Sequence, residues 1–300
     1  MITIQNVSKY FDNLKALDQI TANIGEGQVF GLIGTNGAGK STLMRTMCGV
    51  LKPDEGSILI DDEDVYENPG IKSQIFYISD DQYFFGNGTP ADMLKFYRTW
   101  YPDFDLTRFR KLMGVLNLDV DRKINTFSKG MKKQLSVLFG ICAGTKYLLC
   151  DETFDGLDPV MRQTVKSLFI QEIDTRGLTP IIASHNLREL EDICDHVGLL
   201  HRGGILFSRD LDEMKLGIHK LQCVFAPDTD YVAAMEGMDL LNRETRGSLV
   251  TLTIRGKREH IETVIRSLHP VFYEILPLSL EEIFISETEV QGYDFKNLIL

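Results

Sequence analysis

Hydrophobic and polar positions predict the elements of the first two thirds of the chain. Apolar runs that predict strands lie at 29–33, 57–60, 75–78, 147–150 and 181–183, after a first stretch of β-like runs and turns. The last two runs are continuous, which is typical of strands buried on both faces of a parallel sheet. Apolar residues at helical spacing predict helices at 43–51, within 89–142, and at 159–176. This alternation predicts the α/β class, with a helical insertion at about 88–142.

The pattern changes near Gly217. The segments that follow read as strand, helix, strand, strand, helix and strand, at 220–225, 229–236, 239–245, 248–255, 257–268 and 271–276. That order fits a small ferredoxin-like α+β unit. Ser279 and Glu282 have the spacing of a capping box that opens a last helix. We therefore predict a main domain at 1–216 and a small accessory domain at 217–300.

The composition narrows the class of protein. The 300 residues are 43% hydrophobic and 25% charged, and no apolar run approaches the roughly 20 residues of a membrane-spanning helix. The first residues lack the basic and apolar segments of a signal peptide, and the five cysteines form no Cys-x-x-Cys pair, so we expect a cytoplasmic protein with reduced cysteines. A net charge of −11 argues against a broad nucleic-acid footprint.

A phosphate-binding motif lies between a predicted strand and a predicted helix. The octet GTNGAGKS, at 34–41, matches G-x-x-x-x-G-K-[ST]. Glycines let the backbone N–H groups point at phosphate oxygens, Lys40 would reach the β- and γ-phosphates, and the Ser41 hydroxyl would bind Mg²⁺. The alternative is an ordinary glycine-rich turn, but the strand and helix on either side are the context that the motif requires.

Polar residues end two further predicted strands. Asp151 and Glu152 follow 147–150, and His185 follows 181–183. A carboxylate beside a phosphate loop can hold Mg²⁺, which we assign to Asp151, and Glu152 could accept a proton from an attacking water. His185 could hydrogen-bond a γ-phosphate. The alternatives are that the acids cap the next helix and that the histidine is structural.

A second candidate phosphate site opens a later helix. Ser128 has the position of an N-cap, and Gly130 is a poor helix former in the first turn. A bare backbone and a hydroxyl at the positive end of a helix dipole can bind phosphate.

Together these segments resemble the ATP-binding subunit of a bacterial ABC transporter, over roughly residues 2–215. GTNGAGKST resembles the Walker A motif, YLLCDE the Walker B motif, FDGLDP the D-loop and ASH the segment of the switch histidine. The resemblance implies a P-loop NTPase with a mixed sheet, an ATPase that uses ATP and Mg²⁺, and catalytic roles for Glu152 and His185. The residues implied to bind ATP are Phe11, Gly34, Thr35, Asn36, Gly37, Ala38, Gly39, Lys40, Ser41 and Thr42.

The stretch FSKGM takes the place of the family's signature, usually Leu-Ser-Gly-Gly-Gln. Two such domains pair head to tail, so the resemblance implies that Ser128, Lys129 and Gly130 contact ATP held by a second ATPase subunit, an identical copy or a paralogue. Asp158 of the D-loop is implied to reach the same interface. Lys129 and Met131 depart from the common form, whereas the Ser-x-Gly core is retained.

Two positions depart further from the family pattern. Phe11 aligns with the aromatic residue that stacks on adenine, with Tyr10 as the alternative. The glutamine that the family places three residues after the strand's aromatic is here Asp80, and Gln82 lies two residues on. A carboxylate can bind Mg²⁺ more directly than an amide, so we prefer Asp80 to Gln82 as the Mg²⁺-contacting residue.

The resemblance also implies partners. Tyr83, Phe84 and Phe85 belong to the densest aromatic cluster and lie beside the groove that, in this family, receives a polytopic membrane permease. The segment 278–288 resembles the tail of bacterial exporters of the antibiotic-resistance and lantibiotic-immunity kind. We therefore expect a peripheral protein on the inner face of the cell membrane that powers export. The alternatives are a soluble ABC ATPase that acts on ribosomes or DNA and a small-molecule kinase with a P-loop.

Overall fold

The computed structural model describes residues 1–154, 157–226, 229–276 and 278–290. Two residues of the D-loop, 155 and 156, and the last ten residues of the predicted accessory domain lie outside this part. The chain divides into two compact units, Met1–Ser208 and Arg209–Leu300, and each is described by itself. Among the described residues, no helix is both long and apolar enough to cross a bilayer.

A six-stranded sheet forms the centre of the first unit. Its order is β10-β9-β3-β8-β7-β6, with bounds Gly204–Asp210, His196–His201, Phe30–Ile33, Thr179–Ser184, Tyr147–Asp151 and Ile75–Ile78. The pairs β3–β8, β3–β9, β7–β8 and β6–β7 are parallel, and every residue of β3, β7 and β8 is buried. The predicted parallel sheet is confirmed. Since the strands are parallel, the carboxyl ends of β3, β8 and β7 lie next to one another.

A second, antiparallel sheet completes the core of this unit. Its order is β2-β1-β4-β5, with bounds Leu14–Ile24, Ile2–Phe11, Glu55–Ile60 and Glu63–Asp64. Apolar residues of both sheets share one buried cluster, which includes Leu17, Ile58 and Leu149. Burial of such side chains contributes about 1.5–3 kcal/mol each.

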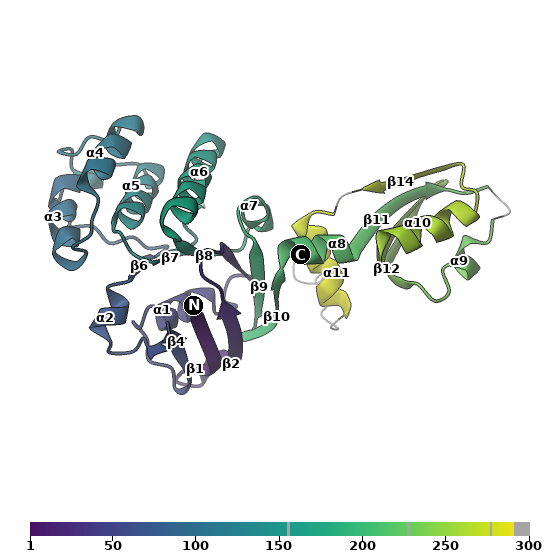
Figure 1. The fold of residues 1–300 in the computed structure, drawn as a ribbon, viewed down its shortest axis with the longest axis horizontal. Helices are drawn as coiled ribbons and strands as arrows, with labels where there is room; N and C mark the ends of the chain where they lie inside the picture. The colour runs from purple at the N-terminus through teal and green to yellow at the C-terminus, as the bar shows by residue number, and fades with distance from the viewer. Residues whose placement is uncertain (155–156, 227–228, 277, 291–300) are drawn as a thin grey trace. The chain divides into compact units, whose positions relative to one another are not determined.

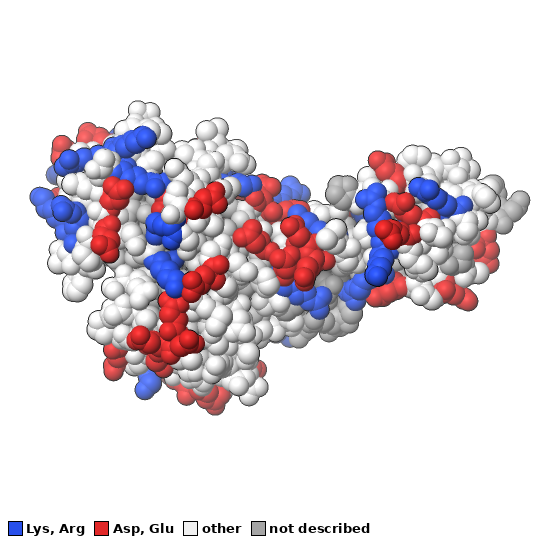
Figure 2. Space-filling view, viewed as in Figure 1, with Lys and Arg blue, Asp and Glu red and all other residues white. Residues whose placement is uncertain are grey.

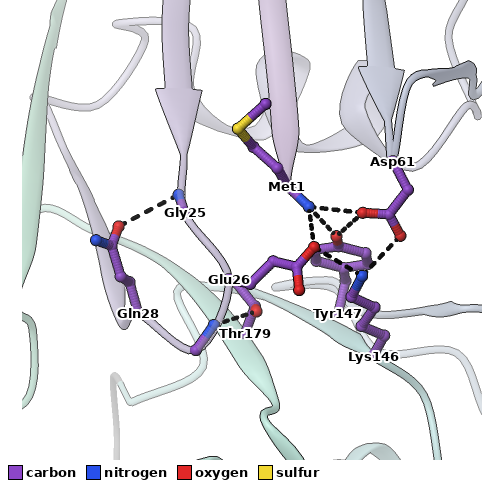
Figure 3. A network of polar contacts seen from close by, with 9 residues as sticks. Met1, Gly25, Glu26, Gln28, Asp61, Lys146, Tyr147 and Thr179 are labelled. Atoms are coloured by element: carbon purple, nitrogen blue, oxygen red, sulfur yellow. Dashed lines mark hydrogen bonds and ion pairs between the residues drawn. The ribbon is translucent and has the colours of Figure 1, made fainter.

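A polar network joins the rims of the two sheets (Figure 3). Lys146 Nζ lies 2.9 Å from Glu26 Oε1 and 2.8 Å from Asp61 Oδ2, and the Tyr147 hydroxyl donates to Asp61 Oδ1 at 2.8 Å. The amino group of Met1 donates to Glu26, Asp61 and Tyr147. Burial alone would raise the pKa of Asp61, but these donors outweigh it and hold that pKa well below its usual value.

Helices surround the sheets of the first unit, and most start at a side-chain cap. Their bounds are α1 Lys40–Met47, α2 Pro69–Lys72, α3 Pro90–Trp100, α4 Leu106–Val115, η1 Ile124–Thr126, α5 Lys129–Cys142, α6 Pro159–Arg176 and α7 Leu187–Glu191. Thr89 and Asp92 form a capping box at α3, and Asp105 caps α4. Figure 1 shows α3, α4 and α5 grouped on one side of β6 and β7, with β1, β2 and β4 on the other. This group is the predicted helical insertion.

The second unit is ferredoxin-like, as predicted. Its strands are β11 Ile218–Val224, β12 Asp239–Arg246, β13 Leu249–Arg255 and β14 Phe272–Leu276, in the antiparallel order β12-β13-β11-β14. Its helices are α8 Leu211–Gly217, α9 Tyr231–Ala234, α10 Arg258–Ser267 and α11 Leu280–Val290. Apolar side chains of α10 pack on one face of the sheet, with Ile261 and Ile265 in its core. Ser279 and Glu282 form the predicted capping box at α11.

Two details differ from the prediction. The helix expected at 229–236 spans only Tyr231–Ala234, and Gly237, which follows closely, has a φ of +95° that no right-handed helix contains. The elements β9, β10 and α8 were not predicted.

Candidate nucleotide-binding site

The phosphate loop connects β3 to α1. Gly37 and Gly39 have φ values of +81° and +107°, in the left-handed region that favours glycine, and Gly39 is the N-cap of α1. Lys40 Nζ donates to the carbonyl oxygens of Gly34 at 2.7 Å and Thr35 at 3.3 Å. The lysine side chain therefore folds back over its own loop, where its ammonium group faces the space that the loop encloses.

Asp151 ends β7, next to the strand that leads to His185. Its side chain is 1% exposed, and Oδ2 accepts a hydrogen bond from the Tyr77 hydroxyl at 3.1 Å, while Oδ1 has no partner among the described residues. Burial raises the pKa of Asp151, and the nearby hydroxyls of Ser41 and Tyr77 offset part of that shift. A buried carboxylate oxygen without a donor, beside a hydroxyl, is a set of oxygen ligands that fits Mg²⁺.

Glu152 lies between two other predicted site residues. Its Oε1 is 3.2 Å from Lys40 Nζ, and its Oε2 is 2.8 Å from His185 Nδ1. The backbone of Glu152 has a φ of +48°, and its N–H donates to the Ala183 carbonyl of β8 at 2.9 Å. The adjacent ends of β7 and β8 thus bring the acid and the histidine together. A carboxylate held in this way can orient a water molecule and accept its proton.

A cavity of about 550 Å³ opens over the phosphate loop. Asp80 lines it, and so does Phe11, which is 44% exposed, whereas neither Gln82 nor Tyr10 does. Gln82 instead has a buried Nε2 without a hydrogen-bond partner in the described part of the chain. The residues around the cavity are Phe11, Leu14, Lys15, Ala16, Asn36, Gly37, Gly39, Lys40, Ser41, Thr42, Asp80, Glu152, Arg202 and Gly203.

Sequence reasoning missed two cations of this cavity, Lys15 and Arg202. Arg202 follows β9, a strand that was not predicted, and its backbone has a φ of +47°. Gly203 packs closely against β2, because a Cβ there would lie 2.8 Å from the Ala16 carbonyl oxygen. The signal that could have located them is the turn Arg202-Gly203-Gly204 after an apolar run.

The residues predicted to contact ATP from the signature and the D-loop, Ser128, Lys129, Gly130 and Asp158, do not line this cavity. Ser128 caps α5 by accepting a hydrogen bond from the Met131 N–H at 3.1 Å, as its sequence position predicted. Asp158 caps α6 by accepting one from the Met161 N–H at 3.0 Å. Lys129 and Gly130 occupy the first turn of α5. Within one chain, these residues do not reach the nucleotide that the phosphate loop would hold.

Four aromatic rings form a continuous row near the surface. Tyr83 is 76% exposed, and its ring contacts Phe85, which contacts Phe96, which in turn contacts Trp100. Each ring pair is edge to face, with centroids 5.5–6.4 Å apart. Trp100 is 63% exposed, and Phe84 is half-buried. Large aromatic side chains at such exposure are enriched where proteins bind other proteins.

The family is shown by similarity to known proteins. Residues 17–155 match the protein family described as ABC transporter. The ABC transporter ATP-binding protein YtrB of Bacillus subtilis is 32% identical over 287 residues, which cover 96% of this chain and 98% of that protein. The lantibiotic transport ATP-binding protein SrtF of Streptococcus pyogenes is 31% identical over 71% of this chain and 92% of its own length. A dimeric ATP-binding cassette, MJ0796, solved with ADP and Pi, shares the fold with a TM-score of 0.63 at 19% identity, covering 70% of this chain and 99% of its own.

The phosphate loop, the paired acids and the histidine thus define a P-loop ATPase. The chain belongs to the family of ABC transporter ATP-binding proteins, and it is the subunit that binds and hydrolyses ATP.

Proposed function

We propose that this subunit works as a head-to-tail dimer and powers export through a separate membrane permease. The observation that carries the catalytic part is the position of Glu152, held between Lys40 and His185 at the edge of the cavity. The relative named for lantibiotic transport supports a role in transport, and the resemblance of the segment 278–288 to the tail of bacterial exporters supports export. The protein would then lie on the inner face of the membrane, bound to the permease. The two compact units support a main ATPase domain followed by an accessory domain, which we propose at 1–216 and 217–300, although the units themselves divide between Ser208 and Arg209.

The contacts of Lys40 suggest how ATP prepares the site. In the structure, this lysine binds its own loop and the Glu152 carboxylate. The phosphates of ATP would compete for the same ammonium group and release Oε1 of Glu152, while His185 would still hold Oε2. The freed oxygen can then orient water and accept its proton. Ser41, Asp151 and Asp80 would hold Mg²⁺, which neutralises charge on the phosphates.

The second half of the ATP site would come from the partner subunit. Ser128 and Asp158 each stand at a helix N-terminus, where backbone N–H groups and the helix dipole favour an anion. In the proposed dimer Ser128, Lys129 and Gly130 cover the γ-phosphate held by the other chain, with Asp158 beside them. Phe11 would stack on adenine at the open side of the cavity.

The aromatic row is the proposed contact with the permease. Tyr83, Phe84 and Phe85 were predicted for this role, and the contacts of Phe85 extend the surface to Phe96 and Trp100. On the face seen in Figure 2, Lys and Arg lie over the α3–α5 group with Asp and Glu among them, and Asp and Glu predominate below this group. That distribution supports a protein partner over a nucleic acid, which needs a continuous basic surface.

The variant Glu152→Gln tests this proposal, because it keeps the size of the side chain and removes the proton acceptor. We expect ATP turnover to fall by ~10²–10⁴-fold and an ATP-bound dimer to accumulate on gel filtration. Lys40→Ala is the matched control: it should lose ATP affinity and remain monomeric with ATP. Undiminished turnover by Glu152→Gln, or no dimer with ATP, would contradict the proposal.

The partner is tested by affinity purification of this subunit from detergent-solubilised membranes and identification of the polytopic membrane protein that co-purifies. A stable complex, with ATP turnover that responds to the permease, supports the transporter role. Sedimentation with ribosomes in place of a membrane complex would favour the soluble alternative.

A further inference from the structure

A second buried lysine contacts the backbone of the proposed catalytic glutamate, whereas Lys40 contacts its carboxylate. Lys133 lies on α5, the helix that Ser128 caps, and only 1% of its side chain is exposed. Its Nζ donates to the backbone carbonyl of Glu152 at 2.5 Å and lies 3.7 Å from Asp80 Oδ1. Burying an ammonium group is unfavourable unless it is paired and hydrogen-bonded. Both contacts therefore help to hold the Lys133 ammonium group in its buried position.

The backbone at Glu152 needs hydrogen bonds from its surroundings to keep its conformation. A glutamate at a φ of +48° adopts a strained backbone conformation that persists only where the surroundings hold it. Two bonds hold this one: the N–H donates to Ala183, and the carbonyl accepts from Lys133. Since the direction of the peptide sets the direction of the side chain, loss of the second bond would let the carboxylate turn away from His185.

The carboxylates near this site give a second reason for a lysine at the position of Lys133. Asp80 and Glu152 line the cavity, and both carboxylates lie close to that of Asp151. In the described structure Lys40 pairs with Glu152, and Lys133 pairs with Asp80. Lys40 must leave Glu152 to bind phosphate, as proposed above. Lys133 contacts a backbone carbonyl and the acid after β6, so it can stay in place when ATP binds.

We propose that Lys133 is a positioning residue for ATP hydrolysis. It holds the Glu152 peptide in its left-handed conformation and ties that peptide to Asp80 and to the helix that begins at the signature. A movement of α5 on formation of the dimer would then reach the catalytic carboxylate directly. This inference rests on the proposed role of Glu152.

Lys133→Met removes the donor and the charge and leaves a flexible apolar side chain in a buried position. We expect kcat for ATP to fall by ~10–100-fold, the effect of a misplaced catalytic group, while the Kd for ATP changes by less than about threefold. Lys132→Met, the same change one residue earlier on α5 at a partly exposed position, should leave both values unchanged. Equal losses in the two variants, or a loss of affinity in place of kcat, would overturn the inference.

Two further variants separate a positioning role from a merely structural one. Lys133→Gln keeps an N–H donor without the charge and should recover part of the kcat lost in Lys133→Met, because the bond to the carbonyl is the contact that matters. In a Glu152→Gln background, Lys133→Met should cause no further loss, because Lys133 acts only through Glu152. A further tenfold loss of kcat in the Glu152→Gln background would show that Lys133 acts through a group other than Glu152.

The same set distinguishes this inference from the proposed function. If Glu152→Gln retains full turnover, the role of Glu152 fails, and the inference fails with it. If Glu152→Gln is inactive and Lys133→Met is fully active with normal affinity, only the inference fails. Thermal unfolding of each variant shows whether it is folded, and Lys133→Gln provides the kcat comparison should Lys133→Met unfold.

Discussion

Two glycines of the phosphate loop share a left-handed backbone and differ in what surrounds them. At Gly37, with a φ of +81°, an added Cβ would meet nothing within 4 Å among the described residues. At Gly39, with a φ of +107°, it would lie 2.6 Å from the Ala16 carbonyl oxygen and 3.2 Å from Leu17 Cδ2. A backbone oxygen cannot move aside as the end of a flexible side chain can. We therefore expect alanine to be tolerated at Gly37 and poorly tolerated at Gly39.

The expected losses of stability follow from the left-handed backbone at both glycines and from the close contact at Gly39 alone. Alanine in the left-handed region costs roughly 1–2 kcal/mol, which is the whole expected effect of Gly37→Ala on the free energy of unfolding. Gly39→Ala adds an overpacking cost of roughly 1–3 kcal/mol, because β2 must shift. The total expected loss in the free energy of unfolding for Gly39→Ala is therefore about 2–5 kcal/mol. In a domain of this size, each kcal/mol lowers Tm by about 2–4 °C.

Two assays test this expectation. Thermal unfolding follows the transition whose Tm rises when ATP is added, and equilibrium titration measures the affinity for ATP. Gly27→Ala is the control, because its φ is +68°, its Cβ would lie in open space within the described structure, and it is outside the loop. Gly27→Ala and Gly37→Ala should lose similar stability, and only Gly37→Ala should lose ATP affinity, since Gly37 lines the cavity. Equal Tm values for Gly37→Ala and Gly39→Ala would refute the reasoning.

Three further predictions concern binding, stability and assembly. Phe11→Ala should raise the Kd for ATP about tenfold, as expected for one lost stacking contact, and Tyr10→Ala should not; equal effects in a titration would argue against stacking by Phe11. Asp61→Asn should lower the free energy of unfolding at pH 7. The difference in this free energy between the variant and wild type, measured by urea unfolding, should shrink as the pH falls below about 4, because the pKa of Asp61 is lower in the folded state than in the unfolded state. A constant difference down to pH 2 would contradict this. Trp100→Ala should weaken co-purification of the permease and leave the ATPase rate of the isolated subunit within about twofold, since Trp100 lies outside the cavity; unchanged co-purification would remove Trp100 from the interface.

Local signals explain which helices could be predicted. The bounds of α6, Pro159–Arg176, agree with the prediction because the sequence marks both ends: Asp158 caps the first turn, proline occupies N1, and Gly177 ends the helix at a φ of +66°. β9 has a weaker signal. Gly198 interrupts its apolar run, because a Cβ there would lie 2.8 Å from the ring of Phe30, which is a tertiary requirement.

The same distinction applies to the site. The phosphate loop, Asp151, Glu152 and His185 could be predicted because each lies in a short motif at a strand end, and parallel strands bring those ends together. The sequence could only favour Asp80 over Gln82 by the chemistry of its side chain, since which of the two lines the cavity depends on how the loop after β6 turns. Lys133 was missed altogether. A lysine in the middle of a helix is usually exposed, and nothing local shows that α5 buries it against the end of β7.

Asp80 and Lys133 are best understood as one feature. A carboxylate in place of the family's glutamine adds a third negative charge close to Asp151 and Glu152, and each neighbouring carboxylate raises the pKa of Asp151 further. A buried lysine 3.7 Å from Asp80 offsets that charge and supports the Glu152 peptide at the same time. Asp80→Gln removes the carboxylate beside this lysine and leaves the bond from Lys133 to the Glu152 carbonyl in place, whereas Lys133→Met removes that bond. The kcat for ATP should therefore fall less in Asp80→Gln than in Lys133→Met.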